Sequence, residues 1–161
     1  MSVKREVKTQ LSFYLAGPIS WVSDTSYIIW RDDITELLES LGHKAINPLK
    51  KYKVAAKEKE NVEKMVTEER TELAREYLRR RIINPDISLL EQSDGMITYV
   101  PSYSVGTSGE MMWHYLHGKP VYVVTTLPVD QWSGWFVGLS TLIFRSWDEL
   151  KEFLRKVEVG V

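Results

Sequence analysis

Cysteine is absent from this chain of 161 residues, and other features that would narrow its function are absent too. Without cysteine there are no disulfides, no thiolate nucleophile and no zinc site built on cysteine. No apolar run approaches the length of a membrane span, and the N-terminal segment lacks the apolar core of a signal peptide. A net charge of -1 gives no general attraction to nucleic acid or to an anionic membrane. We therefore expect a cytoplasmic protein that binds neither nucleic acid nor membrane.

Common catalytic and cofactor motifs are also missing. The sequence contains no GxGxxG, no GxxxxGK[ST] and no GxSxG, which are the signatures of dinucleotide binding, phosphate-binding loops and serine hydrolases. The histidines at positions 43, 114 and 117 lack the spacing of a metal site, because His114 and His117 are three residues apart and no HExxH is present. We expect neither a metal ion nor an organic cofactor.

Short apolar runs that are typical of buried strands alternate with helical patterns along the chain. The expected strands cover residues 11–16, 43–46, 95–100, 121–125 and 142–144. The expected helices cover a stripe from Trp30 to Leu41, the charged segment 54–83 as one long helix or two shorter ones, a helix ending at His117, and residues 147–157. We expect the charged segment to end at Pro85, because a residue before proline avoids the helical region.

Alternation of strands and helices predicts parallel βαβ units and a three-layer, doubly wound α/β sandwich. We expect one domain over residues 1–161, with about five mostly parallel strands. Ligands of such sheets bind beyond the carboxyl ends of the strands. The loops after the first, third and fourth strands should therefore converge, and the first two of them carry Tyr14 with Gly17, and Ser104 with Glu110.

The segment Ser104–Glu110 (SVGTSGE) has two interpretations that the pattern alone leaves open. Thr107 to Glu110 fits a capping box, in which the glutamate bonds back to the amide of the first capping residue. Alternatively, Glu110 is a carboxylate that a first helical turn keeps ionised, and Gly106 and Gly109 let a ligand approach the backbone. A fixed, ionised carboxylate at this edge is what a covalent glycosyl nucleophile requires.

Two aspartates precede the third expected strand, and each has two interpretations. Asp86 follows a proline and caps a short helix, or it handles a proton in a reaction. Asp94 is a turn residue before the strand, or it binds substrate. The aromatic segment 131–136 (QWSGWF) forms a wall for base stacking, an interface between subunits, or the edge of a packed core strand.

Four motifs occur in an order that resembles a known enzyme family. They are Tyr14-Leu-Ala-Gly-Pro18, Asn47-Pro48, Asp86 with Ser93-Asp94, and Val105-Gly-Thr-Ser-Gly-Glu110. Together, over residues 11 to about 125, they resemble the nucleoside 2-deoxyribosyltransferases and the related nucleoside 5′-monophosphate N-glycosidases. The resemblance implies a flavodoxin-like strand order, 2-1-3-4-5.

The resemblance also implies roles for individual residues. Glu110 would be the nucleophile that attacks the anomeric carbon, Tyr14 would orient it, and Asp86 would handle the nucleobase and its proton. Gly17 would let the first loop approach the substrate; Ser104, Gly106 and Asp94 complete the expected binding residues. The partner implied is a small-molecule nucleoside or nucleotide, no cofactor is needed, and a homo-oligomer, a dimer or larger, is expected.

One position departs from the transferase pattern. Six residues before the glutamate that branch has an aspartate, whereas this chain has Ser104, as the monophosphate hydrolases do. The hydrolases in turn have a basic residue in the first loop, and Gly17-Pro-Ile-Ser20 has none; Arg31 is a candidate substitute. We expect 2-deoxyribosyl transfer, with monophosphate hydrolysis as the alternative and a non-catalytic nucleotide-binding module as the second alternative.

Overall fold

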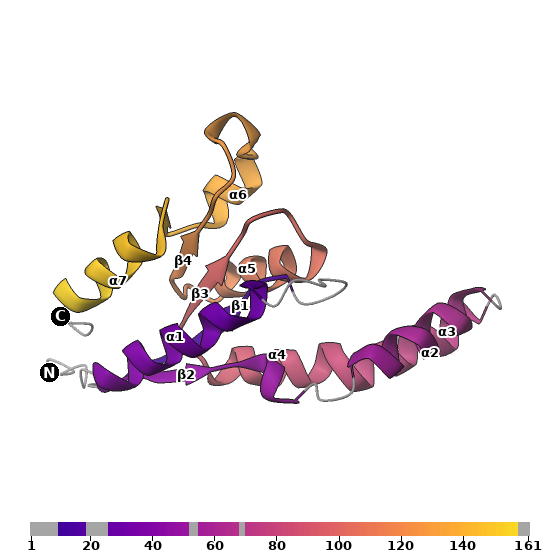
Figure 1. The fold of residues 1–161 in the computed structure, drawn as a ribbon. Coiled ribbons are helices and arrows are strands. Elements are labelled where there is room, and N and C mark those ends of the chain that lie inside the picture. The colour runs from indigo at the N-terminus through magenta and orange to yellow at the C-terminus, as the bar shows by residue number, and fades with distance from the viewer. Residues whose placement is uncertain (1–9, 19–25, 52–54, 68–69, 158–161) are drawn as a thin grey trace, which may run out of the picture.

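A computed structural model of the chain describes residues 10–18, 26–51, 55–67 and 70–157. Strands and helices alternate along most of this length, as Figure 1 shows. The strands are β1 (Ser12–Ala16), β2 (Lys44–Ile46), β3 (Gly95–Tyr99), β4 (Val121–Val124) and β5 (Leu142–Phe144). The helices are α1 (Ser26–Ser40), η1 (Pro48–Lys51), α2 (Ala55–Thr67), α3 (Thr71–Leu78), η2 (Arg79–Ile83), α4 (Asn84–Gln92), α5 (Val105–Leu116), η3 (Val129–Gln131), α6 (Gly134–Leu139) and α7 (Trp147–Lys156).

The five strands form one parallel sheet in the order β2-β1-β3-β4-β5, so the expected doubly wound α/β fold and its strand order are confirmed. In the register of the two central strands, Phe13 lies beside Gly95 and Tyr14 beside Met96. Gly95 suits its place because a Cβ there would lie 3.1 Å from the Phe13 ring. The ring of Phe13 thus packs directly over the start of β3.

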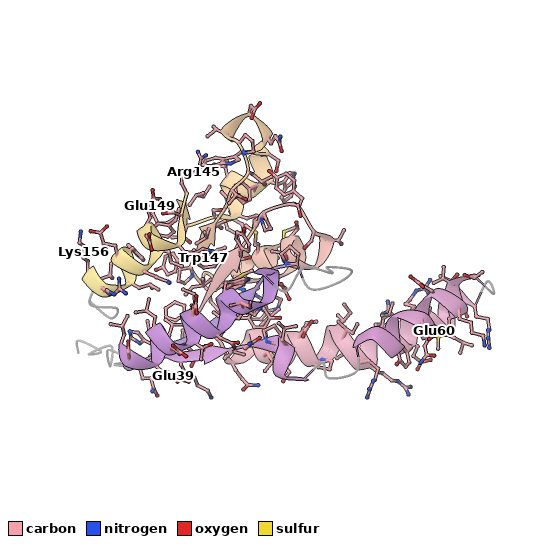
Figure 2. All side chains as sticks on the ribbon, in the orientation of Figure 1. Glu39, Glu60, Arg145, Trp147, Glu149 and Lys156 are labelled. Atoms are coloured by element: carbon pink, nitrogen blue, oxygen red, sulfur yellow. The ribbon has the colours of Figure 1, made fainter. Side chains whose placement is uncertain are left out.

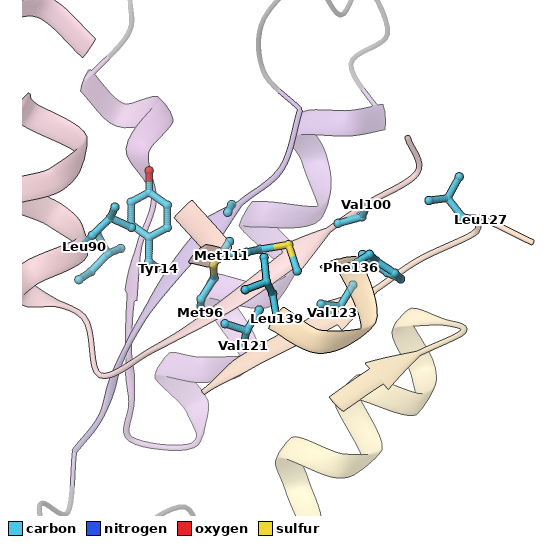
Figure 3. Packing of buried hydrophobic residues seen from close by; sticks show 12 residues of the cluster. Tyr14, Leu90, Met96, Val100, Met111, Val121, Val123, Leu127, Phe136 and Leu139 are labelled. Atoms are coloured by element: carbon cyan, nitrogen blue, oxygen red, sulfur yellow. The ribbon is translucent and has the colours of Figure 1, made fainter. Parts of the chain in front are cut away.

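Helices cover both faces of the sheet, and each face has its own apolar core. On one face α1 and α7 pack on Phe13, Leu15 and Ile97. On the other face α4, α5 and α6 pack on Tyr14, Met96 and neighbouring side chains, which Figure 3 shows from close by. Period-2 alternation along β1 therefore sends Tyr14 into the α5 side and its neighbours into the α1 side.

The charged segment 54–83 does not end at Pro85, which corrects the expectation. Residue 54 lies outside the described residues, and α2 begins at Ala55. From Thr71 the chain stays helical through α3, η2 and α4 as far as Gln92. Pro85 lies in the first turn of α4, directly after η2, which is a turn of π-helix. The wider π turn accommodates the proline ring, whose clash with the preceding turn would otherwise break the helix.

The paired helices α2 and α3 form an arm that extends away from the sheet (Figure 1). Ala74 is buried where the two helices meet, and the charged side chains around it are exposed. Exposed charges elsewhere, such as Glu39 and Lys156, likewise point outward, as does Glu60 on the arm (Figure 2). In the part of the chain that the structure describes, no helix is both long and apolar enough to cross a membrane.

The aromatic segment 131–136 enters a short helix, α6, which the sequence pattern did not predict. The side chain of Ser133 caps α6 by accepting a hydrogen bond from the amide of Phe136 (3.1 Å). Phe136 is buried against α5, whereas Trp135 is 69% exposed. The segment is therefore half core and half surface, and it is not a strand edge.

Candidate active site

A tyrosine and a glutamate from different elements meet on the α5 side of the sheet. The hydroxyl of Tyr14 donates a 2.8 Å hydrogen bond to Oε1 of Glu110. Tyr14 is fully buried in the middle of β1, and Glu110 is half-buried on α5. These residues are 96 positions apart in the sequence, and the parallel sheet brings them together. This hydrogen bond fixes the position of one of the two carboxylate oxygens of Glu110.

Glu110 does not belong to a capping box. The helix begins earlier than the pattern suggested: Ser104 is its capping residue, and its hydroxyl accepts from the amide of Thr107 (3.3 Å). The same hydroxyl donates to the Thr107 hydroxyl (2.8 Å). Glu110 therefore lies in the second turn of α5. Serine and threonine three residues apart are both good caps, and tertiary packing selects the first of them.

Burial changes the charge state expected for Glu110. Loss of hydration, with a smaller contribution from the negative charge of Asp86, raises its pKa from 4.5 to about 7. The hydrogen bond from Tyr14 and the positive charge of Arg31 act in the opposite direction. A carboxylate held fully ionised by the first helical turn was the expectation. The structure instead gives a carboxyl group that changes its charge near neutral pH.

Asp86 reaches the same region from α4. It is half-buried and lies in the first turn of that helix, whose N-cap position is occupied by Ile83. Its negative charge raises the pKa of Glu110, so the two carboxyl groups lie close enough to interact electrostatically. Two neighbouring acidic groups are an arrangement that acid–base chemistry uses.

Arg31 is the residue of this region that the sequence pattern undervalued. It is fully buried on α1, and its guanidinium donates to the carbonyl oxygens of Leu15 (3.3 Å) and Gly17 (3.1 Å). Burial lowers its pKa to about 10, while Glu110 and Tyr14 raise it, so it stays charged at neutral pH. Its spacing from Ile34 and Leu38 places it on the buried stripe of α1, a signal that the sequence carried.

Gly17 is held closely by its neighbours. A Cβ at this position would lie 3.1 Å from the carbonyl oxygen of Tyr99 and 3.3 Å from Nη2 of Arg31. The turn after β1 thus packs onto the end of β3 and onto Arg31. Ile19 and Ser20, which follow in the first loop, lie outside the described residues.

A cavity of about 380 Å³ lies beside this group, between α5 and α6. Its polar lining includes the hydroxyl residues Ser104, Thr107 and Ser108, and its apolar lining includes Phe136. Glu110 projects from the neighbouring face of α5 and does not line the cavity. Gly106 is in the first turn of the helix, and a Cβ there would meet nothing within 4 Å among the described residues.

The structure does not bring Asp94 into this group. Asp94 precedes β3 and therefore lies at the amino edge of the sheet, away from the carboxyl edge. Its Oδ2 accepts from the amide of Ser12 (2.8 Å), and its own amide donates to the carbonyl oxygen of Ser12 (2.7 Å). These bonds join the starts of β1 and β3. Among the described residues, no three histidine or acidic side chains are grouped to hold a metal ion.

Comparison with known proteins finds solved structures with the same fold but with little sequence similarity to this chain. No protein-family model and no curated protein matches the sequence. A solved 2-deoxyribosyltransferase from the psychrotolerant bacterium Bacillus psychrosaccharolyticus, described as a biocatalyst for nucleoside synthesis, aligns with a TM-score of 0.59 and 15% identity. That alignment covers 87% of this chain and 90% of the other.

A second solved structure, a conserved protein from Enterococcus faecalis V583, aligns with a TM-score of 0.63 and 16% identity. It covers 91% of this chain and 98% of the other, so the match includes nearly the whole of both folds. The chain therefore has, over most of its length, the fold of a solved 2-deoxyribosyltransferase.

Proposed function

We propose that this protein is a nucleoside 2-deoxyribosyltransferase that works through a covalent glycosyl-Glu110 intermediate. The observation that carries the proposal is the 2.8 Å hydrogen bond from Tyr14 to Glu110, with Asp86 close enough to influence the same carboxyl group. The fold shared with a solved 2-deoxyribosyltransferase supports the substrate class, a (deoxy)nucleoside. Neither a metal ion nor an organic cofactor is required for the chemistry below.

In the first step the free oxygen of the Glu110 carboxylate attacks the anomeric carbon of the sugar. The bond from that carbon to the base nitrogen breaks, and its electron pair leaves with the base. The transition state has oxocarbenium character, which a nearby carboxylate stabilises. Tyr14 holds the other oxygen in place, and the buried charge of Arg31 favours the ionised form that the step needs.

Asp86 supplies the proton that the departing base requires. A protonated base is a better leaving group, and a half-buried carboxyl group near Glu110 is suited to give the proton. The reverse sequence with a different base, which loses its proton to Asp86, attaches the sugar to that base. Gly17 keeps the first loop close to Tyr99, where it borders the substrate.

Hydrolysis of nucleoside 5′-monophosphates is the second candidate, and one observation favours it. The hydroxyl groups of Ser104, Thr107 and Ser108 line the cavity beside Glu110, at the start of α5. Hydroxyl donors at the beginning of a helix suit a phosphate group. In this version water, rather than a second base, attacks the glycosyl intermediate and releases the sugar phosphate.

We also propose that the protein forms a homo-oligomer. Several large apolar side chains around α5 and α6 are exposed, among them Val105 (93%), Leu116 (70%) and Trp135 (69%). Large apolar side chains left exposed to solvent are candidates for burial in an interface. Sedimentation analysis of the protein at micromolar concentration tests this proposal, and a monomer would contradict it.

Two incubations separate the candidates. A deoxynucleoside plus a second free base should give the exchanged nucleoside if the protein is a transferase. A deoxynucleoside monophosphate alone should give free base and deoxyribose 5-phosphate if it is a hydrolase. A glycosyl adduct on Glu110, located by mass spectrometry of the quenched reaction, identifies the nucleophile, and Glu110→Gln is its control. Thermal stabilisation by nucleosides without turnover would favour the non-catalytic binding module.

A further inference from the structure

A buried histidine links the two helices that carry the acidic groups. His114 lies one turn after Glu110 on α5 and is fully buried. Its Nδ1 is 3.0 Å from the carbonyl oxygen of Glu110, and its Nε2 is 2.8 Å from the hydroxyl of Ser93, which directly follows α4. Because a hydroxyl both donates and accepts, the bond to Ser93 exists in either tautomer of the ring.

Further hydrogen bonds hold the end of α4 in place. The Ser93 hydroxyl also contacts the carbonyl oxygen of Leu90 (2.7 Å), and Ser93 itself is buried. The ammonium group of Lys119, just after α5, donates to the carbonyl oxygens of Leu90 (3.2 Å) and Ser93 (2.5 Å). The bonds from His114 and Lys119 thus join the last turn of α4 to the last turn of α5 and the residues after it.

The ring of His114 also packs beside the ring of Tyr14. The ring centroids of Tyr14 and His114 are 6.3 Å apart, and both side chains are fully buried. Tyr14 therefore contacts α5 twice, at His114 through its ring and at Glu110 through its hydroxyl. Burial, together with the nearby charge of Lys119, lowers the pKa of His114 to about 4, so the ring is neutral at physiological pH.

We propose that His114 is a positioning residue for the glycosyl-transfer site. Through Ser93 it sets the spacing of α5, which carries Glu110, against α4, which carries Asp86, and its ring supports Tyr14. It does not touch the substrate. The inference rests on the proposed function, because the spacing of two carboxylates matters most when both act on one glycosidic bond. Small errors in such spacing are costly, since a displacement of about 1 Å reduces rates about 100-fold.

Three substitutions remove or keep individual bonds of His114. His114→Leu has a similar volume and makes neither bond. His114→Gln places an amide near the position of Nε2 and keeps the bond to Ser93, whereas His114→Asn places its amide near Nδ1 and keeps only the contact with the Glu110 carbonyl. His117→Leu is the matched control, because His117 makes the same kind of contact with a carbonyl one turn back (Trp113, 2.7 Å) but its side chain is exposed.

We expect His114→Leu and Ser93→Ala each to lower kcat about 100-fold with KM changed less than about threefold. The double variant should have a kcat no lower than that of the less active single variant, because both substitutions remove the same hydrogen bond between His114 and Ser93. His114→Gln should recover kcat to within about fivefold of wild type, His114→Asn should not, and His117→Leu should match wild type. Rates are compared per folded molecule, with folding checked by circular dichroism. Equal kcat for the Gln and Leu variants, or unchanged kcat in Ser93→Ala, would overturn the proposal.

A second measurement keeps the inference independent of turnover. The carboxyl group of Glu110 is followed by ¹³C NMR across pH in the wild type, Ser93→Ala, His114→Leu and His117→Leu proteins. Looser packing of Tyr14 and Glu110 admits water. The pKa of Glu110 should therefore lie nearer the ordinary value for glutamate in Ser93→Ala and His114→Leu, and it should be unchanged in His117→Leu. If wild type lacks all glycosidic activity, the proposed function fails while this test still stands. Identical titrations in all four proteins would refute the positioning role itself.

Discussion

Two acidic residues at opposite edges of the sheet, Asp94 and Glu110, lie in opposite electrostatic environments. Asp94, at the amino edge, accepts a hydrogen bond from the amide of Ser12, and its own amide donates one to the carbonyl oxygen of Ser12. Glu110 is half-buried, close to the negative charge of Asp86, and its pKa is raised to about 7. The amino edge uses its carboxylate to join two strands. The other group is held in an environment that opposes its charge, as reactive groups often are.

The sharpest contrast between the two carboxylates is expected in activity. Glu110→Gln removes the nucleophile while keeping the size of the side chain, so kcat/KM for glycosidic cleavage should fall at least about 1,000-fold. Initial rates with the best deoxynucleoside substrate measure this loss. A variant that keeps more than about a tenth of wild-type activity would exclude Glu110 as the covalent nucleophile.

Glu110→Gln should also remove a pH dependence from the free energy of unfolding. The pKa of Glu110 is about 7 in the native protein, above its ordinary value of 4.5, so the native state holds a proton that the unfolded state releases between these pH values. Wild type therefore loses up to about 3 kcal/mol of unfolding free energy as pH rises from 4.5 to above 7, and Glu110→Gln does not. Urea denaturation of both proteins at pH 4.5 and pH 8 tests this, and parallel pH profiles would contradict it.

Removing the hydroxyl of Tyr14 should have an intermediate effect. Its hydrogen bond lowers the pKa of Glu110, so in Tyr14→Phe that pKa rises above about 7. Activity should increase with pH as Glu110 ionises, and the midpoint of the kcat/KM profile should move to higher pH in the variant. At neutral pH we expect a loss of about 10- to 100-fold, equal to one hydrogen bond to a charged group. An unshifted midpoint would separate Tyr14 from the titration of Glu110.

The smallest effect on activity is expected at the amino edge. Asp94→Ala removes the bond to the Ser12 amide and should lower the free energy of unfolding by about 1–2 kcal/mol. Because Asp94 lies at the edge opposite the proposed site, kcat/KM should stay within about twofold of wild type. Denaturant titration and initial rates on the same preparation measure both. A large loss of activity in a stable variant would return Asp94 to the site.

The fold was predictable because its strands are nearly continuous apolar runs. Residues such as Val121–Val124 are buried on both faces of the sheet, and this produces a strong local pattern. The pairing of Tyr14 with Glu110 followed from the rule that parallel strands bring their carboxyl ends to one edge. Asp94 was expected at the site from the family resemblance, and its position directly before β3 places it at the amino edge, where it bonds to Ser12.

The remaining differences concern features that depend on packing rather than on local pattern. Ser104 and Thr107 are equally good caps in isolation, and the true start of α5 is decided by its contacts. The helix α6 contains two glycines in six residues, Gly134 and Gly138, which weakens any helical signal. A buried arginine such as Arg31 is unusual, so its place on an apolar stripe was not enough to identify it.

The π turn between the arm and α4 determines how insertions and deletions would affect the molecule. In an α-helix each residue turns the chain by about 100°, so one extra or missing residue within Arg79–Ile83 would rotate the whole arm about its axis. The helix α4 is fastened at its far end by Ser93 and Lys119, so Asp86 would keep its place during such a change. Insertions and deletions in the π turn can thus change in large steps which face of the arm is presented, while the carboxyl edge of the sheet stays as it is.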